Sequence, residues 1–292
     1  MRRRTFGTLG MALALAASPA VPRWLKAAHA ASYALCIAVN AGAALGWFGE
    51  TNAEVSGKWP VPITPAGWAF SIWGLIFSLQ GVGAVYTLLN VGYNRDSHEK
   101  EHAVLAGCWV QALWLSQDLW QVAFSNESFY IAFFLIASAC AFGIFSVLRL
   151  HEARETFGAF SFVTSASIAV PTSINASWLL AATCVQLLIT LKSGGMSEGD
   201  LSVVSVALVV MAALVAVGAV LALGDIAWGF TAVWALVAIA VNNKADQPAV
   251  YAACLTAVPL LAVCVAVSLV RRLARVRSPE GRAQFVRNPA VA

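Results

Sequence analysis

Polar and aromatic side chains recur at helical spacing inside an apolar run near residue 115. Four of them follow one another at intervals of three, four and three residues, which places them on one face of a helix: Gln111, Trp114, Asp118 and Gln121. A neighbouring stripe contains Gln117, Trp120 and Phe124. A carboxyl group in such a setting can orient the polar group of a ligand or carry a proton.

Asp118 is the one charged residue of this set, and it lies well inside a predicted membrane span. Exposing its charge to lipid would cost at least a few kcal/mol, so we expect it to face a bundle interior or a water-filled cavity. No Lys or Arg is expected at the same depth, so its partner should be Asn175, Trp178 or another amide. The alternatives are a solvated carboxylate near the outer end of the helix and a neutral, hydrogen-bonded structural acid.

A second set of candidate residues lies in a long uncharged run that Pro171 divides. It consists of Asn175, Trp178 and Gln186. Tryptophans bury a large flat area with few rotatable bonds, so Trp178 together with tryptophans of other helices suits a flat, apolar ligand. The Ser and Thr residues nearby are more typical of close helix packing and interhelical hydrogen bonds.

A proline-punctuated loop leads into an aromatic segment over residues 58–77. Its three prolines fix φ and remove backbone donors, so the loop cannot be helical: Pro60, Pro62 and Pro65. The aromatic residues that follow are Trp68, Phe70, Trp73 and Phe77. Trp68 and Trp73 are five residues apart and fall on different helix faces, so we expect one to line a pocket while the other packs.

The composition identifies the elements that must position these residues. Of 292 residues, 60% are hydrophobic and 11% charged, whereas soluble domains are about half apolar and about a quarter charged. The sequence therefore predicts an all-α, polytopic transmembrane helical bundle. Its charges delimit eight predicted spans: 31–49, 65–91, 103–125, 128–148, 168–191, 201–223, 226–242 and 248–270. The basic residues lie at the termini and between spans, which gives no support for nucleic-acid binding.

The distribution of basic residues predicts the orientation. With eight spans, all but three of the 18 Lys and Arg residues fall on the side that holds both termini. The other side holds only Lys58, Lys192 and Lys244. Because cytoplasmic loops are enriched in Lys and Arg, we expect both termini on the cytoplasmic side, or its equivalent in an organelle.

Few other residues suggest chemistry. Residues 1–30 form a basic tail or a targeting segment, with Ala28-His29-Ala30 as a candidate cleavage site. His98 and His102 are spaced for a metal or haem-iron pair, but their charged neighbours favour a solvated loop. The six cysteines lie in apolar runs without CxxC spacing, which is typical of buried side chains. No nucleophile–base set, phosphate loop or metal-ligand array is evident in the sequence, so it supports no ordinary enzyme class and no metal site.

Residues 64–76 resemble the TspO/MBR family of tryptophan-rich sensory and translocator-like proteins. The shared signature is a Pro- and Trp-rich loop that enters the second helix, here Pro62, Pro65, Trp68, Phe70 and Trp73. Gln117 and Gln186 stand where the family carries asparagines, and the Trp68–Trp73 spacing is one residue shorter than in the small five-helix members. The resemblance implies a five-helix core over 31–192 and a three-helix extension over 193–271, followed by a basic tail over 272–292.

The resemblance also implies a binding or sensing function for a hydrophobic planar ligand. The expected ligand is a porphyrin, a haem-like tetrapyrrole or a sterol, held between the first five helices. The predicted ligand-binding residues are Trp68, Phe70, Trp73, Trp114, Gln117, Asp118, Trp120, Asn175, Trp178 and Gln186.

Two other functions remain open at the level of the sequence. One is a carrier for a small solute that uses Asp118 as the coupling acid. The other is a structural membrane subunit whose tryptophan faces bind pigments or partner helices. The expected partners are the lipid bilayer and a hydrophobic small molecule, and a second copy of the chain is a candidate partner.

Overall fold

The computed structural model describes residues 23–89, 109–157 and 160–277, and these contain helices and no strand. Seven of the described helical segments are long and apolar enough to cross a membrane. The predicted all-α polytopic bundle is therefore confirmed. The segments involve α2 (Arg23–Ala44), η1 with α4 (Gly67–Ser71, Ile72–Leu89), α7 (Phe129–Phe157), α8 with η2 and α9 (Phe162–Thr164, Ser165–Ala169, Val170–Ser193), α10 (Glu198–Ala222), α11 (Ile226–Asn243) and α12 (Pro248–Arg277).

One further long helix, α6 (Trp109–Ser125), carries the Asp118 face. It has 17 described residues, and the start of the span predicted at 103–125 lies outside the described residues, as do His98 and His102. A short helix, α3 (Asn52–Lys58), lies in the loop between α2 and η1. Its first turn is closed by a capping box between Thr51 and Glu54.

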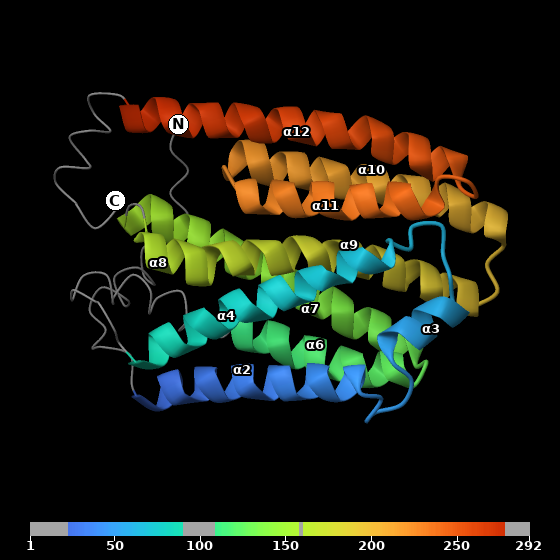
Figure 1. Cartoon of the computed structure of the whole chain (residues 1–292), viewed down its shortest axis with the longest axis horizontal. Helices are drawn as coiled ribbons and strands as arrows, with labels where there is room; N and C mark the ends of the chain where they lie inside the picture. The colour runs from blue at the N-terminus through green and yellow to red at the C-terminus, as the bar shows by residue number, and fades with distance from the viewer. Residues whose placement is uncertain (1–22, 90–108, 158–159, 278–292) are drawn as a thin grey trace, which may run out of the picture.

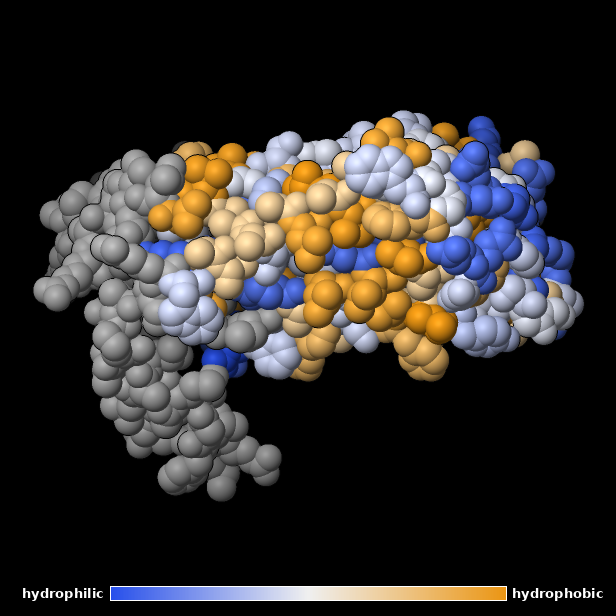
Figure 2. Space-filling model, turned by 90° about the horizontal axis from the view of Figure 1, so that it is seen from below, coloured by the Kyte–Doolittle hydropathy of each residue, from blue (hydrophilic) through white to orange (hydrophobic). Residues whose placement is uncertain are grey.

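The long helices run side by side along the long axis of the molecule (Figure 1). In that view α2, α4 and α6 lie on one side, α10, α11 and α12 on the other, and α7 and α9 between them. Hydrophobic residues gather over the middle of the face in Figure 2, and hydrophilic residues gather at one end. This distribution is the one that a lipid environment requires of a helical bundle.

The first helix differs from its prediction. It begins at Arg23, eight residues before the predicted span, and residues 1–22 lie outside the described part of the chain. Lys26 and His29 are 8% and 5% exposed, so the start of α2 is packed against the rest of the bundle. Residues 23–30 therefore belong structurally to the first helix.

The chain forms a π-helical turn at the start of the span predicted at 168–191. Residues 165–169 form the wide turn η2, which leads directly into α9 with Pro171 in its first turn. Pro171 has no N–H, so it cannot donate the bond that an α-helix would direct to the Ser167 carbonyl. π-turns are a common accommodation of such a mismatch within a helix.

Helix α4 lies directly against the backbone of this turn. A Cβ placed on Gly83 would overlap the carbonyl oxygen of Ser167. The backbones of α4 and η2 are therefore in direct contact, which only a glycine at residue 83 permits.

We predict that Gly83→Ala destabilises the bundle, because the new methyl group must push η2 away from α4. Overpacking of this kind typically costs about 1–3 kcal/mol, and we expect a lower midpoint of thermal unfolding for the protein in mild detergent. The control is Gly74→Ala in the same helix, where a Cβ would meet no atom within 4 Å. Equal midpoints for the two variants would contradict the predicted contact.

Candidate functional site

The aromatic residues of the 64–76 stretch pack on two other helices. Trp178 of α9, which is 2% exposed, makes edge contacts with Phe70 and Trp73 at centroid distances of 5.8 and 6.4 Å. Trp68 contacts Trp234 of α11 edge-on at 4.6 Å. Trp68 and Trp73 thus face different helices, as their spacing predicts. The half-exposed Trp68 packs on α11, and Trp73 packs towards α9.

Helix α11 fixes the backbone of the same stretch by hydrogen bonds. The Ala66 N–H donates to Ala238 O at 3.1 Å, and the amides of Asn242 and Asn243 donate to Thr64 O at 3.0 and 2.9 Å. The Trp234 indole N–H donates to the Ala69 carbonyl at 3.1 Å. Trp234 is absent from the predicted site. The sequence feature that could have identified Trp234 is its position as a single tryptophan within the otherwise aliphatic run 232–239.

The four residues predicted to share one face of α6 do so, and the face packs against α2 and α4. Asn40 of α2 joins two of them, donating to Asp118 Oδ1 at 3.3 Å and accepting from Gln121 Nε2 at 2.7 Å. Asp118 is 5% exposed. The amide partner expected for Asp118 is therefore Asn40, and it is neither Asn175 nor Trp178.

The remaining two residues of that face complete the contact with the first two spans. The Trp114 indole N–H donates to Gln80 Oε1 of α4 at 3.2 Å, and its ring packs on His29 and Tyr33. Gln111 Nε2 lies 3.1 Å from His29 Nδ1. Sequence reasoning missed the buried Gln80, because a lone polar residue in an apolar span gives no indication of its partner.

The second stripe of α6 faces α9. The Trp120 indole N–H donates to Gln186 Oε1 at 3.1 Å, and Trp120 stacks on Phe124 at 5.2 Å. Gln186 also lies 3.4 Å from the Thr190 hydroxyl. The sequence did not predict this pairing, which joins α6 to α9 directly.

Two buried amides stand apart from these pairs. Gln117 of α6 and Asn175 of α9 are both 0% exposed, and neither the nitrogen nor the oxygen of either side-chain amide has a hydrogen-bond partner among the described residues. Leaving a buried polar group without a partner costs about 1–3 kcal/mol. These two amides, on helices that the Trp120–Gln186 bond joins, are the residues of the predicted site whose side-chain nitrogen and oxygen both lack partners among the described residues.

The predicted site residues therefore fall into two aromatic groups. The first group packs between α4, α9 and α11 and consists of Trp68, Phe70, Trp73 and Trp178. The second group lies on α6 and contacts α2, α4 and α9; it consists of Trp114, Asp118 and Trp120. Gln117 and Asn175 belong to the helices α6 and α9 that carry these groups.

An ion-pair network secures the loop at the end of the bundle. Lys58 of α3 pairs with Glu50 and, at 3.3 Å, with Glu127, while Trp59 donates to Glu127 at 3.3 Å. The hydrogen bond to Glu50 raises the pKa of Lys58, and the hydrogen bond from the Thr51 backbone lowers the pKa of Glu54. These groups are solvent-exposed, so their ion pairs contribute little to the stability of the loop.

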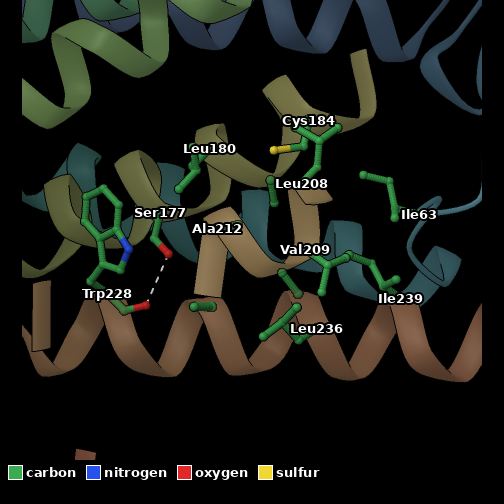
Figure 3. A pocket seen from close by; sticks show the side chains of 13 residues that line it. Ile63, Ser177, Leu180, Cys184, Leu208, Val209, Ala212, Trp228, Leu236 and Ile239 are labelled. Carbon is green, nitrogen blue, oxygen red and sulfur yellow. Dashed lines mark hydrogen bonds between the residues drawn. The ribbon is translucent and has the colours of Figure 1, made fainter. Parts of the chain in front are cut away.

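A small cavity lies between α9, α10 and α11 (Figure 3). Its volume is about 30 Å³, which is room for one or two water molecules. The wall is mostly aliphatic, and the Ser177 hydroxyl donates to Trp228 O at 3.1 Å beside it. None of the predicted ligand-binding residues lines this cavity, and it is too small for a tetrapyrrole.

The apolar spans and the polar contacts between them define an α-helical integral membrane protein. The chain belongs to the family described as TSPO-like protein, which matches residues 26–267. The resemblance stated from residues 64–76 is thus confirmed, and the match extends through the last three helices. Comparison with curated proteins and with solved structures gives no match.

Proposed function

We propose that the protein binds a flat, hydrophobic ligand of the porphyrin, tetrapyrrole or sterol class between its first five helices. The observation that carries the proposal is the pair of fully buried, unpartnered amides Gln117 and Asn175. A ligand with peripheral carboxylate, carbonyl or hydroxyl groups would supply the missing hydrogen-bond partners. The aromatic side chains of the predicted site would cover its faces.

The residue types of the predicted site support a specific rather than a general apolar site. Trp178 and Trp73 present large ring surfaces from α9 and α4, while Trp114 and Trp120 have their indole N–H groups already engaged. Polar recognition therefore falls to Gln117 and Asn175. A small number of placed polar groups within an aromatic lining is typical of sites for cofactor-sized ligands.

We predict that Gln117→Leu combined with Asn175→Leu weakens binding of protoporphyrin IX without destabilising the ligand-free protein. Loss of two hydrogen bonds at about 0.5–1.5 kcal/mol each should raise the Kd about five- to 150-fold. The unfolding midpoint of the ligand-free protein should stay equal or rise, since two unsatisfied groups are removed. Saturable quenching of tryptophan fluorescence reports the Kd.

The control is Gln121→Leu, the same chemical change on the same helix. Its amide donates to Asn40, so we expect a lower unfolding midpoint and a protoporphyrin Kd within twofold of the wild type. Non-saturable quenching by the wild type, or quenching that Trp68→Ala with Trp178→Ala leaves unchanged, would refute the proposal.

We also infer that the chain crosses the membrane eight times, with α6 as the third span and both termini on the cytoplasmic side. The loops of the three isolated lysines meet at one end of the bundle. Lys58 pairs with Glu127, Lys192 Nζ donates to Pro60 O at 2.8 Å, and Asn243, next to Lys244, donates to Thr64 O. The Glu50 N–H donates to Ser125 O at 3.1 Å, so α6 returns to the end at which α4 begins.

This topology predicts which engineered cysteines react with a membrane-impermeant maleimide. Gly57→Cys and Lys244→Cys should be labelled in intact cells, because both lie in loops on the outer side. Arg271→Cys should be labelled only after permeabilisation. Labelling of Gly57→Cys and Lys244→Cys from opposite sides would mean an odd number of spans between them, and would refute the eight-span topology.

A second candidate function is the transport of a small solute with Asp118 as the coupling acid. The chain of polar contacts from Asp118 through Asn40 to Gln121 favours it, because a buried carboxyl group that accepts a hydrogen bond from an amide can exchange a proton within a span. The amide–carboxyl contact crosses from α6 to α2, so proton binding would alter the packing of these two helices.

We predict that Asp118→Asn abolishes any pH-dependent component of solute uptake in proteoliposomes, because an amide cannot carry the proton. Uptake that depends equally on pH in Asp118→Asn and in the wild type would exclude the coupling role. Ser125→Ala, at another buried polar position of the same helix, serves as the control and should retain the wild-type profile.

A further inference from the structure

A larger cavity lies at the end of the bundle opposite the proline-rich loop. Its volume is about 590 Å³, and its walls come from the C-terminal parts of α7 and α12, from η2 and the start of α9, and from the turn between α10 and α11. It is therefore bounded jointly by helices of the predicted core and helices of the extension. No residue of the proposed ligand site lines it.

Two arginines from different helices converge on this cavity. Arg154 of α7 lies with its guanidinium carbon 5.3 Å from the Phe160 ring centroid, which orients the side chain by a cation–π contact. Arg272 of α12 donates to Gly224 O at 3.1 Å. Neither guanidinium forms a salt bridge with a carboxylate of the described residues.

The acidic side chain in the cavity wall makes its hydrogen bonds to other groups, and its charge also attracts Arg154. Asp225 Oδ2 accepts from the Ser173 hydroxyl at 2.5 Å, and Oδ1 accepts from the Trp228 N–H at 3.1 Å. These bonds cap α11 and join it to α9. Among the described lining residues Asp225 is the only acid, so the wall keeps a net positive charge with free guanidinium donors.

The edge of the cavity is apolar and faces outward. Phe230 of α11 is 58% exposed and Leu269 of α12 is 38% exposed, and both line the cavity. On helices of a membrane bundle, such exposed apolar side chains contact lipid chains. The cavity thus places a cationic wall beside a lipid-facing apolar edge, an arrangement that matches an anionic amphiphile.

We propose that this cavity binds the phosphate headgroup of an anionic membrane lipid, with Arg154 and Arg272 on the phosphate and an acyl chain over Phe230 and Leu269. The planar donors of arginine suit phosphate oxygens, and basic pockets between membrane helices at the cytoplasmic side are suited to anionic headgroups. The lipid would bridge α7 of the predicted core to α11 and α12. This gives the last three helices a role that is separate from ligand binding by the core.

The test uses the full chain in mild detergent with dioleoyl phosphatidylglycerol, dioleoyl phosphatidylcholine or soluble glycerol 3-phosphate as the probe. We expect phosphatidylglycerol to raise the unfolding midpoint saturably and to remain bound in native mass spectrometry, and phosphatidylcholine to do neither. Glycerol 3-phosphate should bind at least tenfold more weakly, because it lacks the acyl chains.

Variants locate the site. Arg154→Gln with Arg272→Gln should raise the apparent Kd for phosphatidylglycerol at least tenfold, while Arg271→Gln, an exposed neighbour outside the cavity, should change it less than twofold. Quenching by protoporphyrin should be unchanged in all three proteins, which separates this proposal from the function of the core.

Three outcomes would overturn the proposal. Equal stabilisation of the wild type by phosphatidylglycerol and phosphatidylcholine would remove the need for an anionic headgroup, and this comparison requires no variant. Glycerol 3-phosphate binding as tightly as the lipid would indicate a site for a free phosphate compound. Equal loss of affinity in Arg271→Gln and in the double variant would indicate general attraction to the basic end of the bundle.

Discussion

The docking of the proline-rich stretch on α11 is the constraint around which the bundle is arranged. Prolines free the chain from helical structure, but they leave carbonyl groups that an apolar environment cannot satisfy. The side-chain amides of Asn242 and Asn243 donate hydrogen bonds to the Thr64 carbonyl, and the Ala238 carbonyl accepts one from the Ala66 N–H. Because these partners lie on α11, the entry to the second span depends on a helix 170 or so residues further along the chain.

The segment predicted as a three-helix extension therefore also helps to hold the other helices in place. Helices α10–α12 do not only enlarge the bundle, because α11 also supplies Trp234 to Trp68 and its N-cap Asp225 to Ser173 of α9. The aromatic stretch lies between α9 and α11, so α11 contributes to its orientation. The family match covers residues 26–267 and so includes α10 and α11.

The sequence was sufficient for properties that depend on one segment at a time. Hydropathy indicated the membrane helices, and the 3–4–3 spacing placed Gln111, Trp114, Asp118 and Gln121 on one face of α6. It was insufficient for pairings between segments: Asn40 with Asp118 is a contact across 78 residues, and nothing local to Asn40 indicates it. The start of α2 was misjudged for a related reason, since Lys26 and His29 have the composition of a tail and are buried only by tertiary packing.

The close approach of Gly83 to Ser167 also determines how far apart two segments of the bundle lie. Because the two backbones touch, main-chain atoms rather than side chains set the distance between α4 and η2. The opposite end is held by the exposed ion pairs of Lys58, by the hydrogen bond from Lys192 to Pro60 O, and by backbone hydrogen bonds of Ala66 and Glu50. A side-chain change at the proline-rich end can therefore be compensated by the remaining bonds, whereas the contact at Gly83 contains no side chain that could rearrange.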